Sequence, residues 1–518
     1  MTTIATPKPV TKRNIRNDYA AGVASLRPFY KHSLQDIDFV AIREAKHYAD
    51  HHRSTLVEVL QAQYAALPSI PAVNNSLELL ASPDTFSLTT GHQLNIMGGP
   101  MYTPYKVLTV AKLAHQLTEQ DPNNPVVPVF WIHTEDHDFE EINHYFSDFG
   151  KKETYKAPFA SATGIHELTE EVSSLIPEHF AQELKDAYAT GNSLAEATLR
   201  FAHHVYGPYG VLVLDASDPA LKALFKPVLE KELFSQFSET AVLEQNSALN
   251  ELGYPQQVHP REINLFWLDE KGRDRILKRG DDFGIDGRET IISKAEMEAL
   301  VQNQPERFSP NVILRPLYQE YILPNLAYTG GWGELAYWMQ LKGVFEATDT
   351  PFPLLLPRFS ATMFTQKQQA DWEALGFSLA DIKTEEHMLF RQYMPNVWDD
   401  EQYKALTESV QEAFDALGEY IGTESKTLPR SVIGQQVKTT RFFKNMEKKL
   451  HRLKRDQNRE PFQKIHTLKR AINPDGAVQE RTLGLASFPA FSVEKIINQI
   501  YKELEPLSFK HSFISLED

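Results

Sequence analysis

Short apolar runs alternate with amphipathic stretches in the first third of the chain. The run at 126–132 is β-branched and aromatic and follows Pro125, which is typical of a buried strand. Residues 86–90 predict an earlier strand that ends in a glycine-rich turn, and residues 103–118 predict the helix between the two strands. Such a βαβ unit predicts a parallel sheet with a ligand crevice at the carboxyl ends of its strands.

The middle of the chain has a less regular pattern, and we interpret residues 150–310 as insertions into the α/β core. The elements predicted there are strands at 211–214 and 264–268, a helix at 219–236 and a hairpin turn at 269–272. Outside this region, residues 36–66 predict a polar helical stretch. The apolar run at 352–356 predicts a further strand, where the chain returns to the core.

From about residue 365 to residue 470 the pattern changes to long helices. Apolar residues recur there at steps of three and four, which is typical of a coiled-coil seam. The two predicted seams are Leu406, Val410, Ala413, Leu417 and Tyr420, and Phe443, Met446, Leu450 and Leu453. The first helix is acidic and the second is basic, so we expect them to attract along their flanks. The basic helix fits a solvated face, self-association or polyanion binding.

Composition limits the class of protein. Of the 518 residues, 42% are hydrophobic and 24% are charged, which is ordinary for a globular enzyme. The net charge of −16 argues against broad nucleic-acid binding, which needs clustered cations. The chain has no cysteine, and therefore no disulfide and no cysteine ligand for zinc. No apolar run approaches the roughly 18 residues of a membrane span, and no apolar segment follows the basic first residues. We therefore expect a cytoplasmic protein.

A glycine-rich segment follows the first predicted strand. It reads TGHQ at 90–93 and GGPMYTPYK at 98–106. Paired glycines let backbone approach a ligand closely, and the helix that follows offers free N–H groups to an anion. Lys106 adds a positive charge near that helix end. The segment predicts a site for phosphate or carboxylate, with a tight turn as the structural alternative.

An acidic, histidine-rich run, HTEDHDFEEINH at 133–144, follows the second strand. At the carboxyl end of a parallel strand its side chains point into the ligand crevice. They could bind an amine, act as a base or hold a metal. His133 and His137 have the spacing of helical zinc ligands but straddle a strand end, so we expect no metal. The structural alternative is a helix start capped by acids.

Two later segments complete the candidate chemistry. The run from LRPLYQE at 314–320 to GGWGELAYW at 330–338 combines glycines, a glutamate and aromatics, which could grip an ammonium group or a base ring. Its structural alternative is an aromatic core under a loop. The run LPRFSAT at 356–362 offers an arginine and hydroxyl groups, which can clamp phosphate.

Together these segments resemble the bacillithiol biosynthesis cysteine-adding enzymes. The matching runs are TGHQ with GGPMYTPYK, VVPVFWIHTEDHDFEEINH, LRPLYQEYILPNLAYTGGWGELAYWMQLKGVFE and LLLPRFSATM. They occur in the family's order and spacing over nearly the whole chain. That family is similar to class I aminoacyl-tRNA synthetases and to the mycothiol cysteine ligase. The resemblance implies a Rossmann-like core with connective insertions and a helical coiled-coil domain that forms a homodimer.

The resemblance also implies a reaction. In the last step of bacillithiol synthesis, the carboxyl group of L-cysteine acylates the amine of glucosaminyl malate. The chain departs from the class I signatures, however. Tyr102 and Tyr105 stand where the first signature has its two histidines, and Arg358-Phe359-Ser360 replaces the lysine-rich second signature. These signatures stabilise the phosphates of ATP, so ATP or ADP is a possible cofactor whose consumption is open.

The predicted division of the chain follows from the pattern and the resemblance. It comprises the N-terminal segment with the first half of the core (1–150), connective insertions (151–310), the second half of the core (311–364), the coiled-coil domain (365–470) and a C-terminal segment that packs on the core (471–518).

We assign roles to the candidate residues as hypotheses. Asp136, His137 and Asp138 are the catalytic candidates, which hold the amine and remove its proton. Arg358 and Ser360 are the candidates for phosphate. The candidates for substrate binding are His92, Gln93, Gly98, Gly99, Tyr102, Tyr105, Lys106, Asn143, Gln319, Asn325, Gly330, Gly331, Glu334 and Tyr337. Two rival classes are an amide ligase or nucleotidyl transferase with another substrate, and a non-catalytic dimeric scaffold.

Overall fold

The computed structural model describes residues 13–147, 150–156, 161–426 and 429–517. The basic N-terminal patch lies largely outside these residues. The chain forms two compact units, one of residues 1–361 with 480–512 and the other of residues 362–479 with 513–518. The five-part division expected from the sequence is finer than these two units and stays a prediction.

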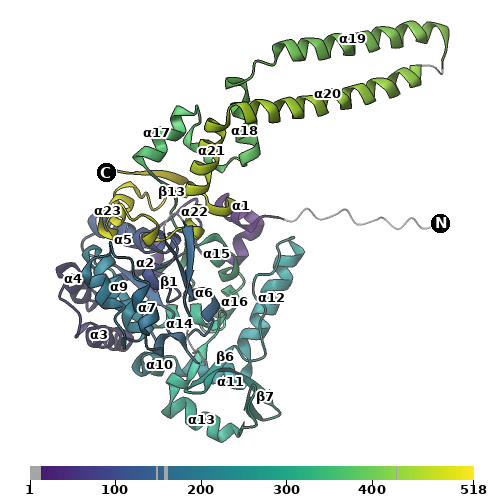
Figure 1. Ribbon diagram of the computed structural model, residues 1–518. Helices are drawn as coiled ribbons and strands as arrows, with labels where there is room; N and C mark the ends of the chain where they lie inside the picture. The colour runs from purple at the N-terminus through teal and green to yellow at the C-terminus, as the bar shows by residue number, and fades with distance from the viewer. Residues whose placement is uncertain (1–12, 148–149, 157–160, 427–428, 518) are drawn as a thin grey trace, which may run out of the picture. The chain divides into compact units, whose positions relative to one another are not determined.

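A five-stranded parallel sheet forms the centre of the first unit (Figure 1). Its strands in spatial order are β12 (Leu354–Pro357), β11 (Asn325–Gly330), β1 (Phe86–His92), β2 (Val126–Ile132) and β5 (Leu212–Asp215). All four neighbouring pairs run parallel, with Phe86 opposite Val126 and His92 opposite Ile132 in the β1–β2 pair. The sheet confirms the predicted α/β class.

The strand order reverses direction beside β1. The chain first adds β2 and β5 on one side of β1, and only much later adds β11 and β12 on the other side. Because parallel crossovers are right-handed, helices between β1 and β5 cover one face and helices between β11 and β12 cover the other. Ligands of such sheets bind at the reversal point, outside the carboxyl ends of the strands. Here that point lies between β1 and β11.

Helices make up most of the rest of the first unit, and the longest of them, α5, occurs where the apolar pattern predicts a helix. The helices are α1 (Ile15–Ala20), α2 (Phe39–Glu44), α3 (Asp50–Tyr64), α4 (Pro71–Leu80), α5 (Tyr102–Gln120), α6 (Phe139–Ile142), α7 (Glu170–Ser174), α8 (Gln182–Ala187), α9 (Leu194–Tyr206), α10 (Pro219–Leu224), α11 (Lys226–Ser235), α12 (Phe237–Glu251), α13 (Lys294–Asn303), α14 (Leu314–Ile322), α15 (Trp332–Trp338), α16 (Lys342–Glu346) and α23 (Val493–Glu503). The helix predicted at 103–118 is α5.

Two predicted helices are each broken into two. The helix expected at 219–236 is interrupted at Phe225, because Pro227 has no backbone N–H to continue the ladder and disfavours helical geometry just before it. The stretch expected at 36–66 is interrupted between α2 and α3. There Lys46 contacts Glu320, and the Tyr48 hydroxyl donates to the Ile322 carbonyl, so tertiary contacts override the local pattern.

The inserted region contains an antiparallel sheet. Its strands in spatial order are β10 (Phe308–Pro310), β6 (Leu265–Asp269), β7 (Gly272–Arg279), β8 (Asp282–Ile285) and β9 (Ile291–Ile292). Asp269 pairs with Gly272, which confirms the hairpin turn predicted between β6 and β7. Two smaller ladders pair β3 (His144–Ser147) with β4 (Lys151–Thr154), and β13 (Ser360–Thr365) with β14 (His511–Leu516).

The second unit is mainly helical. Its helices are α17 (Gln366–Ala374), α18 (Glu386–Tyr393), α19 (Glu401–Glu424), α20 (Pro429–Gln457) and α21 (Arg459–Ile472). A small apolar core around Trp372, Leu389 and Phe462 holds α17, α18 and α21 together. The helices α19 and α20 form a long antiparallel hairpin (Figure 1).

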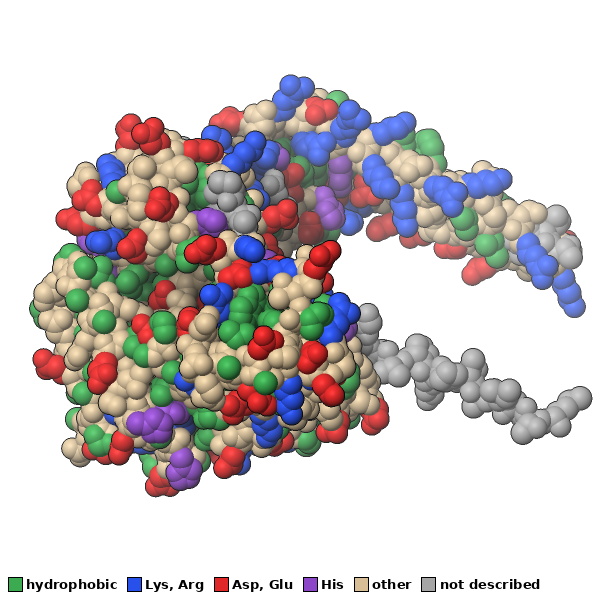
Figure 2. Space-filling view, turned by 90° about the horizontal axis from the view of Figure 1, so that it is seen from below, with side chains coloured by type: hydrophobic (Ala, Val, Ile, Leu, Met, Phe, Trp, Pro, Cys, Tyr) green, Lys and Arg blue, Asp and Glu red, His purple; other side chains and the backbone are tan. Residues whose placement is uncertain are grey.

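The hairpin packs through a different seam of α19 from the one predicted. Leu406, Leu417 and Tyr420 are 60%, 44% and 68% exposed, whereas Tyr403 donates its hydroxyl proton to the Phe443 carbonyl of α20. No ion pair joins α19 to α20 within the described parts of these helices. Figure 2 shows Lys and Arg side chains along the hairpin with Asp and Glu side chains beside them. The predicted seam of α19 therefore faces outward.

Candidate functional site

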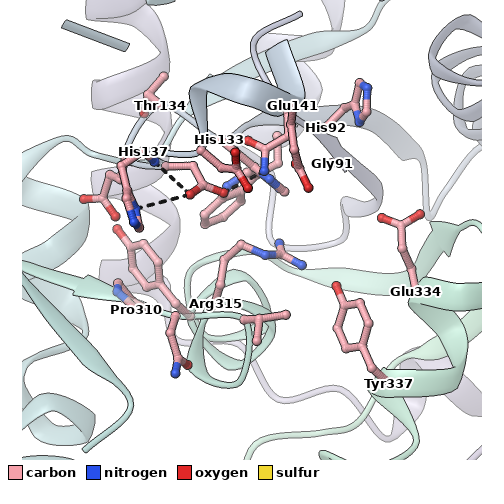
Figure 3. A pocket seen from close by; sticks show the side chains of 18 of the residues that line it. Gly91, His92, His133, Thr134, His137, Glu141, Pro310, Arg315, Glu334 and Tyr337 are labelled. Carbon is pink, nitrogen blue, oxygen red and sulfur yellow. Dashed lines mark hydrogen bonds and ion pairs between the residues drawn. The ribbon is translucent and has the colours of Figure 1, made fainter. Parts of the chain in front are cut away.

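A cavity of about 1040 Å³ lies at the carboxyl edge of the parallel sheet, within the first unit. The ends of β1 and β2 form one side, α14 and the start of α15 form another, and the antiparallel sheet contributes β6 and β7. Figure 3 shows His137 and Glu334 on opposite sides, with Arg315 between them. The structure thus brings the acidic run and both sides of the strand-order reversal into one pocket.

Most of the predicted site residues line this cavity. They are His92, Gln93, Tyr102, Lys106, Asp136, His137, Asp138, Gly331, Glu334, Tyr337 and Arg358. The others do not line it: Gly98, Gly99, Tyr105, Asn143, Gln319, Asn325, Gly330 and Ser360. Their proposed contacts with substrate stay predictions.

Gly98 and Gly99 both have positive φ angles, of 80° and 68°. A Cβ atom on Gly98 would lie 2.9 Å from the ring of Phe201, and one on Gly99 would lie 3.0 Å from Cβ of Asn95. These glycines fit the tight-turn alternative. Tyr105 is fully buried, its ring lies edge-on to Phe359, and burial raises the pKa of its hydroxyl.

Gln319 and Asn325 belong to a buried polar network. Both donate side-chain hydrogen bonds to Oε1 of Glu320, over 3.0 and 2.6 Å. The Thr89 hydroxyl donates to Oδ1 of Asn325 over 2.9 Å, and Lys46 pairs with Glu320. The network ties β1, β11 and α14 together beneath the cavity. Asn143 lies apart from it, with Oδ1 3.0 Å from Nδ1 of His144.

Lys106 and Glu334 form a buried ion pair at the strand-order reversal. The Lys106 ammonium lies 2.7 Å from Oε2 of Glu334 and donates to the Gly91 carbonyl over 3.0 Å. Glu334 also accepts from the Gly331 amide over 2.6 Å and from the Tyr328 hydroxyl over 3.1 Å. Burial alone would raise the pKa of Glu334, but Lys106 and the Gly331 amide outweigh it and lower that pKa. The pair joins β1, α5 and α15.

Asp136 is held as a carboxylate by three donors. Gln93 donates to Oδ2 over 2.6 Å, the His137 amide donates to Oδ1 over 2.8 Å, and Arg273 lies 3.4 Å from Oδ1. Burial opposes the charge, but Arg273 and these hydrogen bonds lower the pKa of Asp136 overall. Asp136 is thus a fixed negative charge on the cavity wall.

His137 is half-exposed and has a defined tautomer. Its Nδ1 lies 3.0 Å from Nη1 of Arg273, and because arginine only donates, this nitrogen is the acceptor. Burial and then Arg273 lower the pKa of His137 against the opposing charges of Asp136 and Asp138, which favours the neutral ring. A neutral ring with an accepting Nδ1 carries its hydrogen on Nε2. In this arrangement His137 offers a donor, rather than a base, at Nε2.

His92 and His133 are two further neutral histidines in the wall. Burial and then Lys106 lower the pKa of His92 to about 3, and burial and then Arg315 lower the pKa of His133 well below its usual value. Neither Nε2 atom has a hydrogen-bond partner among the described residues. A Cβ atom on Gly91 would lie 2.9 Å from Nε2 of His133, so any larger residue at position 91 would have to displace that ring.

Two carboxylates on the rim complete the acidic side. Asp138 is exposed and directly precedes α6, and Glu141 is exposed within that short helix. Partial burial raises the pKa of Glu141, and the negative charges of Asp138 and Asp136 add to this effect. The site therefore contains carboxylates whose pKa values are shifted in opposite directions, which is typical of acid–base sites.

Arg358 lines the cavity but forms an ion pair outside it. Its guanidinium binds both carboxylate oxygens of Glu480, over 3.0 and 2.6 Å, and the Ser360 hydroxyl donates to the same carboxylate. Both members of the Arg358–Glu480 pair are more than 90% buried. The two residues predicted to bind phosphate are thus engaged by a glutamate.

Several cavity residues were missed by the sequence reasoning, including Arg261, Arg273 and Arg275 in the inserted region. Arg261 lies in the loop before β6, and Arg273 and Arg275 lie in β7; these segments carry no motif, so isolated arginines in them give no local signal. Their role follows only from the antiparallel sheet that brings them to the cavity.

The described residues contain no group of three or more His, Asp or Glu side chains placed to hold a metal ion. No described helix is long and apolar enough to cross a membrane.

A doubly wound parallel sheet with a charged cavity at its strand-order reversal defines a Rossmann-like α/β enzyme. Residues 1–359 match the N-terminal Rossmann-like domain of the bacillithiol biosynthesis protein BshC, and residues 361–516 match its C-terminal coiled-coil domain. The chain belongs to the BshC family.

Full-length relatives agree with this assignment. The chain and a protein from Cytophaga hutchinsonii are 35% identical over 499 residues. This alignment covers 95% of this chain and 94% of that protein. The chain and a protein from Flavobacterium johnsoniae are 34% identical over 513 residues, and this alignment covers 96% of each of the two chains. Both relatives carry the name "Putative cysteine ligase BshC". The predicted family and ligase class are confirmed.

Proposed function

We propose that this protein joins the carboxyl group of L-cysteine to the amine of glucosaminyl malate, the last step of bacillithiol biosynthesis. The observation that carries the proposal is the cavity at the strand-order reversal of a BshC-family chain. Its wall presents carboxylates for an ammonium group and arginines for carboxylates. A non-catalytic scaffold has no need for such a wall.

The acidic side of the cavity handles the amine. Asp136 is a fixed negative charge that holds the protonated amine, and Asp138 extends this surface at the rim. Glu141 takes the proton, because its raised pKa makes it a better base than Asp136. This assignment changes the expected roles, since His137 donates from Nε2 while Arg273 occupies Nδ1.

The freed amine attacks the carboxyl carbon of cysteine. Overall, a C–N bond forms, a C–O bond of the carboxyl group breaks, and the oxygen leaves as water with the two protons that the ammonium group gives up. Tyr337, which lines the cavity beside Glu334, orients the cysteine. Lys106 and Glu334 keep the β1 and β11 ends in place rather than contacting the reacting atoms.

The predicted phosphate contacts do not fit a free cradle for ATP. Arg358 and Ser360 are bound to Glu480, Lys106 is bound to Glu334, and Gly98 and Gly99 lie outside the cavity lining. We therefore assign none of these residues to a nucleotide. Whether ATP supplies the energy is decided by leaving it out of the assay.

The test uses purified protein with L-cysteine, glucosaminyl malate and ATP, with bacillithiol followed by mass spectrometry. We expect product from the wild type, and a fall in kcat of about 10²–10⁴-fold in Glu141→Gln, as for loss of a general base. Glu140→Gln is the matched control, because Glu140 is the exposed neighbour and does not line the cavity. No product from the wild type contradicts the function, and product with another amino acid favours the rival ligase class.

We also propose that the protein is a homodimer formed by the hairpin. The outward-facing residues Leu406, Leu417 and Tyr420 of α19 give an apolar stripe, and α20 adds exposed Val437 and Phe442. The acidic charge of α19 complements the basic charge of α20 on a second copy. Sedimentation should give a dimer for the wild type and a monomer for Leu406→Ser with Tyr420→Ser. An unchanged dimer contradicts this surface.

We place the reaction in the cytoplasm, and we propose that neither a membrane nor nucleic acid takes part. A chain without cysteine forms no disulfide, so its composition does not favour an oxidising compartment. Cell fractionation with an antibody to the protein tests this location, and recovery in the membrane fraction would contradict it.

A further inference from the structure

The cavity contains arginines that no carboxylate neutralises. Seven Lys and Arg side chains line it, against five Asp and Glu side chains, although the whole chain has a net charge of −16. Lys106, Arg273 and Arg358 have their own carboxylate partners. Among the described residues, no ion pair involves the remaining arginines, which are Arg261, Arg275, Arg315 and Arg481.

Arg315 is the most deeply placed of these cations. It lies in the first turn of α14, and its Nη1 donates to Oε1 of Gln319 over 3.3 Å. Its Nη2 is buried and has no hydrogen-bond partner among the described residues. Figure 3 shows its side chain between Gly91 and His133 on one side and Glu334 and Tyr337 on the other. A deeply placed guanidinium that forms no ion pair favours binding of an anion, and the nearby charge of Glu334 offsets only part of this preference.

Hydrogen bonds of two asparagine side chains link the backbone at Arg261 to the backbone at Arg315. The fully buried Asn264 accepts from the Arg261 amide over 3.1 Å and donates to the Arg261 carbonyl over 2.8 Å. Asn311 donates to Oδ1 of Asn264 over 2.9 Å, and the Arg315 amide donates to the Asn311 carbonyl over 2.8 Å. The backbone segments that carry these two arginines are therefore hydrogen-bonded to each other on the cavity wall.

Arg275 lies on the strand next to this network. It pairs with Phe266 across β6 and β7, and Phe266 pairs with Ser309 of β10, which ends just before Asn311. Neighbouring strands are about 4.8 Å apart, so Arg275 is within about 10 Å of Ser309, backbone to backbone. Arg261, Arg275 and Arg315 all line the cavity, and we call these three residues the arginine wall.

We infer that the arginine wall is the subsite for the two carboxylates of the malate group, with Arg315 on one and Arg261 and Arg275 on the other. This inference rests on the proposed function. Arginine is the side chain that matches a planar carboxylate with two parallel hydrogen bonds. Arg261, Arg275 and Arg315 line the same cavity as the carboxylates of the acidic run, so a substrate that carries both an amine and carboxylates can contact both sets of side chains at once.

The test measures binding of L-malate by calorimetry, alongside ATP as a second probe. We expect the dissociation constant of malate to rise at least tenfold in Arg261→Gln and in Arg315→Lys, while that of ATP is unchanged. Arg279→Gln is the matched control, because Arg279 is exposed on the same strand as Arg275 but does not line the cavity. An unchanged malate affinity in both variants, or a loss confined to ATP, overturns the subsite.

Kinetics separate this subsite from the proposed reaction. We expect Arg261→Gln to raise KM for glucosaminyl malate at least tenfold with kcat within threefold of the wild type. The wild type should prefer glucosaminyl malate to methyl glucosaminide, which has no carboxylate, and the variant should lose that preference. If the wild type binds malate through the wall but makes no bacillithiol, the subsite stands and the function fails. If bacillithiol forms with an unchanged KM, the subsite fails and the function stands.

Discussion

Replacing Lys106 by methionine tests the ion pair at the strand-order reversal. The change removes a charge whose side chain is 4% exposed and leaves Glu334, whose side chain is 27% exposed, without its cation. Breaking a buried pair by removing one partner costs about 3–5 kcal/mol. Because Glu334 keeps some contact with water and keeps its bonds from the Gly331 amide and the Tyr328 hydroxyl, we expect a loss below this range, about 2–3 kcal/mol of unfolding free energy.

Urea unfolding followed by tryptophan fluorescence measures this loss. The control is Lys151→Met, since the Lys151–Glu153 pair has a lysine that is 69% exposed and should contribute at most about 1 kcal/mol. The double variant Lys106→Met with Glu334→Leu should recover much of the loss, because two apolar groups leave no buried charge. A Lys106→Met variant as stable as the surface control would refute the reasoning.

Three further predictions concern groups around the cavity. Gly91→Ala places a Cβ atom 2.9 Å from a histidine nitrogen and should cost about 1–3 kcal/mol of unfolding free energy and most of the activity, whereas Gly333→Ala, with open space around its Cβ, should keep its stability. His92 has a folded pKa of about 3, so its stabilisation is complete above pH 6.5 and falls by about 1.4 kcal/mol per pH unit as the pH drops towards 3. Unfolding measured between pH 4 and 6.5 should therefore show a shallower acid slope in His92→Asn, and an equal slope would contradict the buried neutral ring. Arg358→Gln should destabilise by about 3–5 kcal/mol, and a double-mutant cycle with Glu480→Gln should show strong coupling rather than additivity.

Local pattern was sufficient for the elements of the core. The apolar run at 126–132 and the helix at 103–118 gave β2 and α5 nearly to the residue, because a buried strand and an amphipathic helix have distinct periods. The break at Phe225 was readable in principle from Pro227, which cannot continue a helix. The face of α19 that packs against α20 could not be predicted from the sequence. Leu406 and Tyr403 both fit a heptad pattern, and only the packing of the two helices shows which of them lies in the seam.

The site was only partly predictable for a similar reason. The acidic run and Glu334 were visible because their residues cluster in sequence beside glycines and strand ends. Arg273 reaches the same cavity from the inserted sheet, and its bond to His137 changes which ring nitrogen carries the hydrogen. Such a contact between segments far apart in sequence leaves no trace in either segment, so the role expected for His137 could not be checked before the structure.

The late arrival of β11 beside β1 has a consequence for synthesis of the chain on the ribosome. Thr89 pairs with Tyr328, so the floor of the cavity stays open until most of the first unit has emerged. Until then one edge of β1 is unpaired and available to other nascent chains. Substrate can bind only after this closure, and it then stabilises the completed sheet by mass action. Cellular supply of the small molecule could thereby set how much newly made protein survives proteolysis.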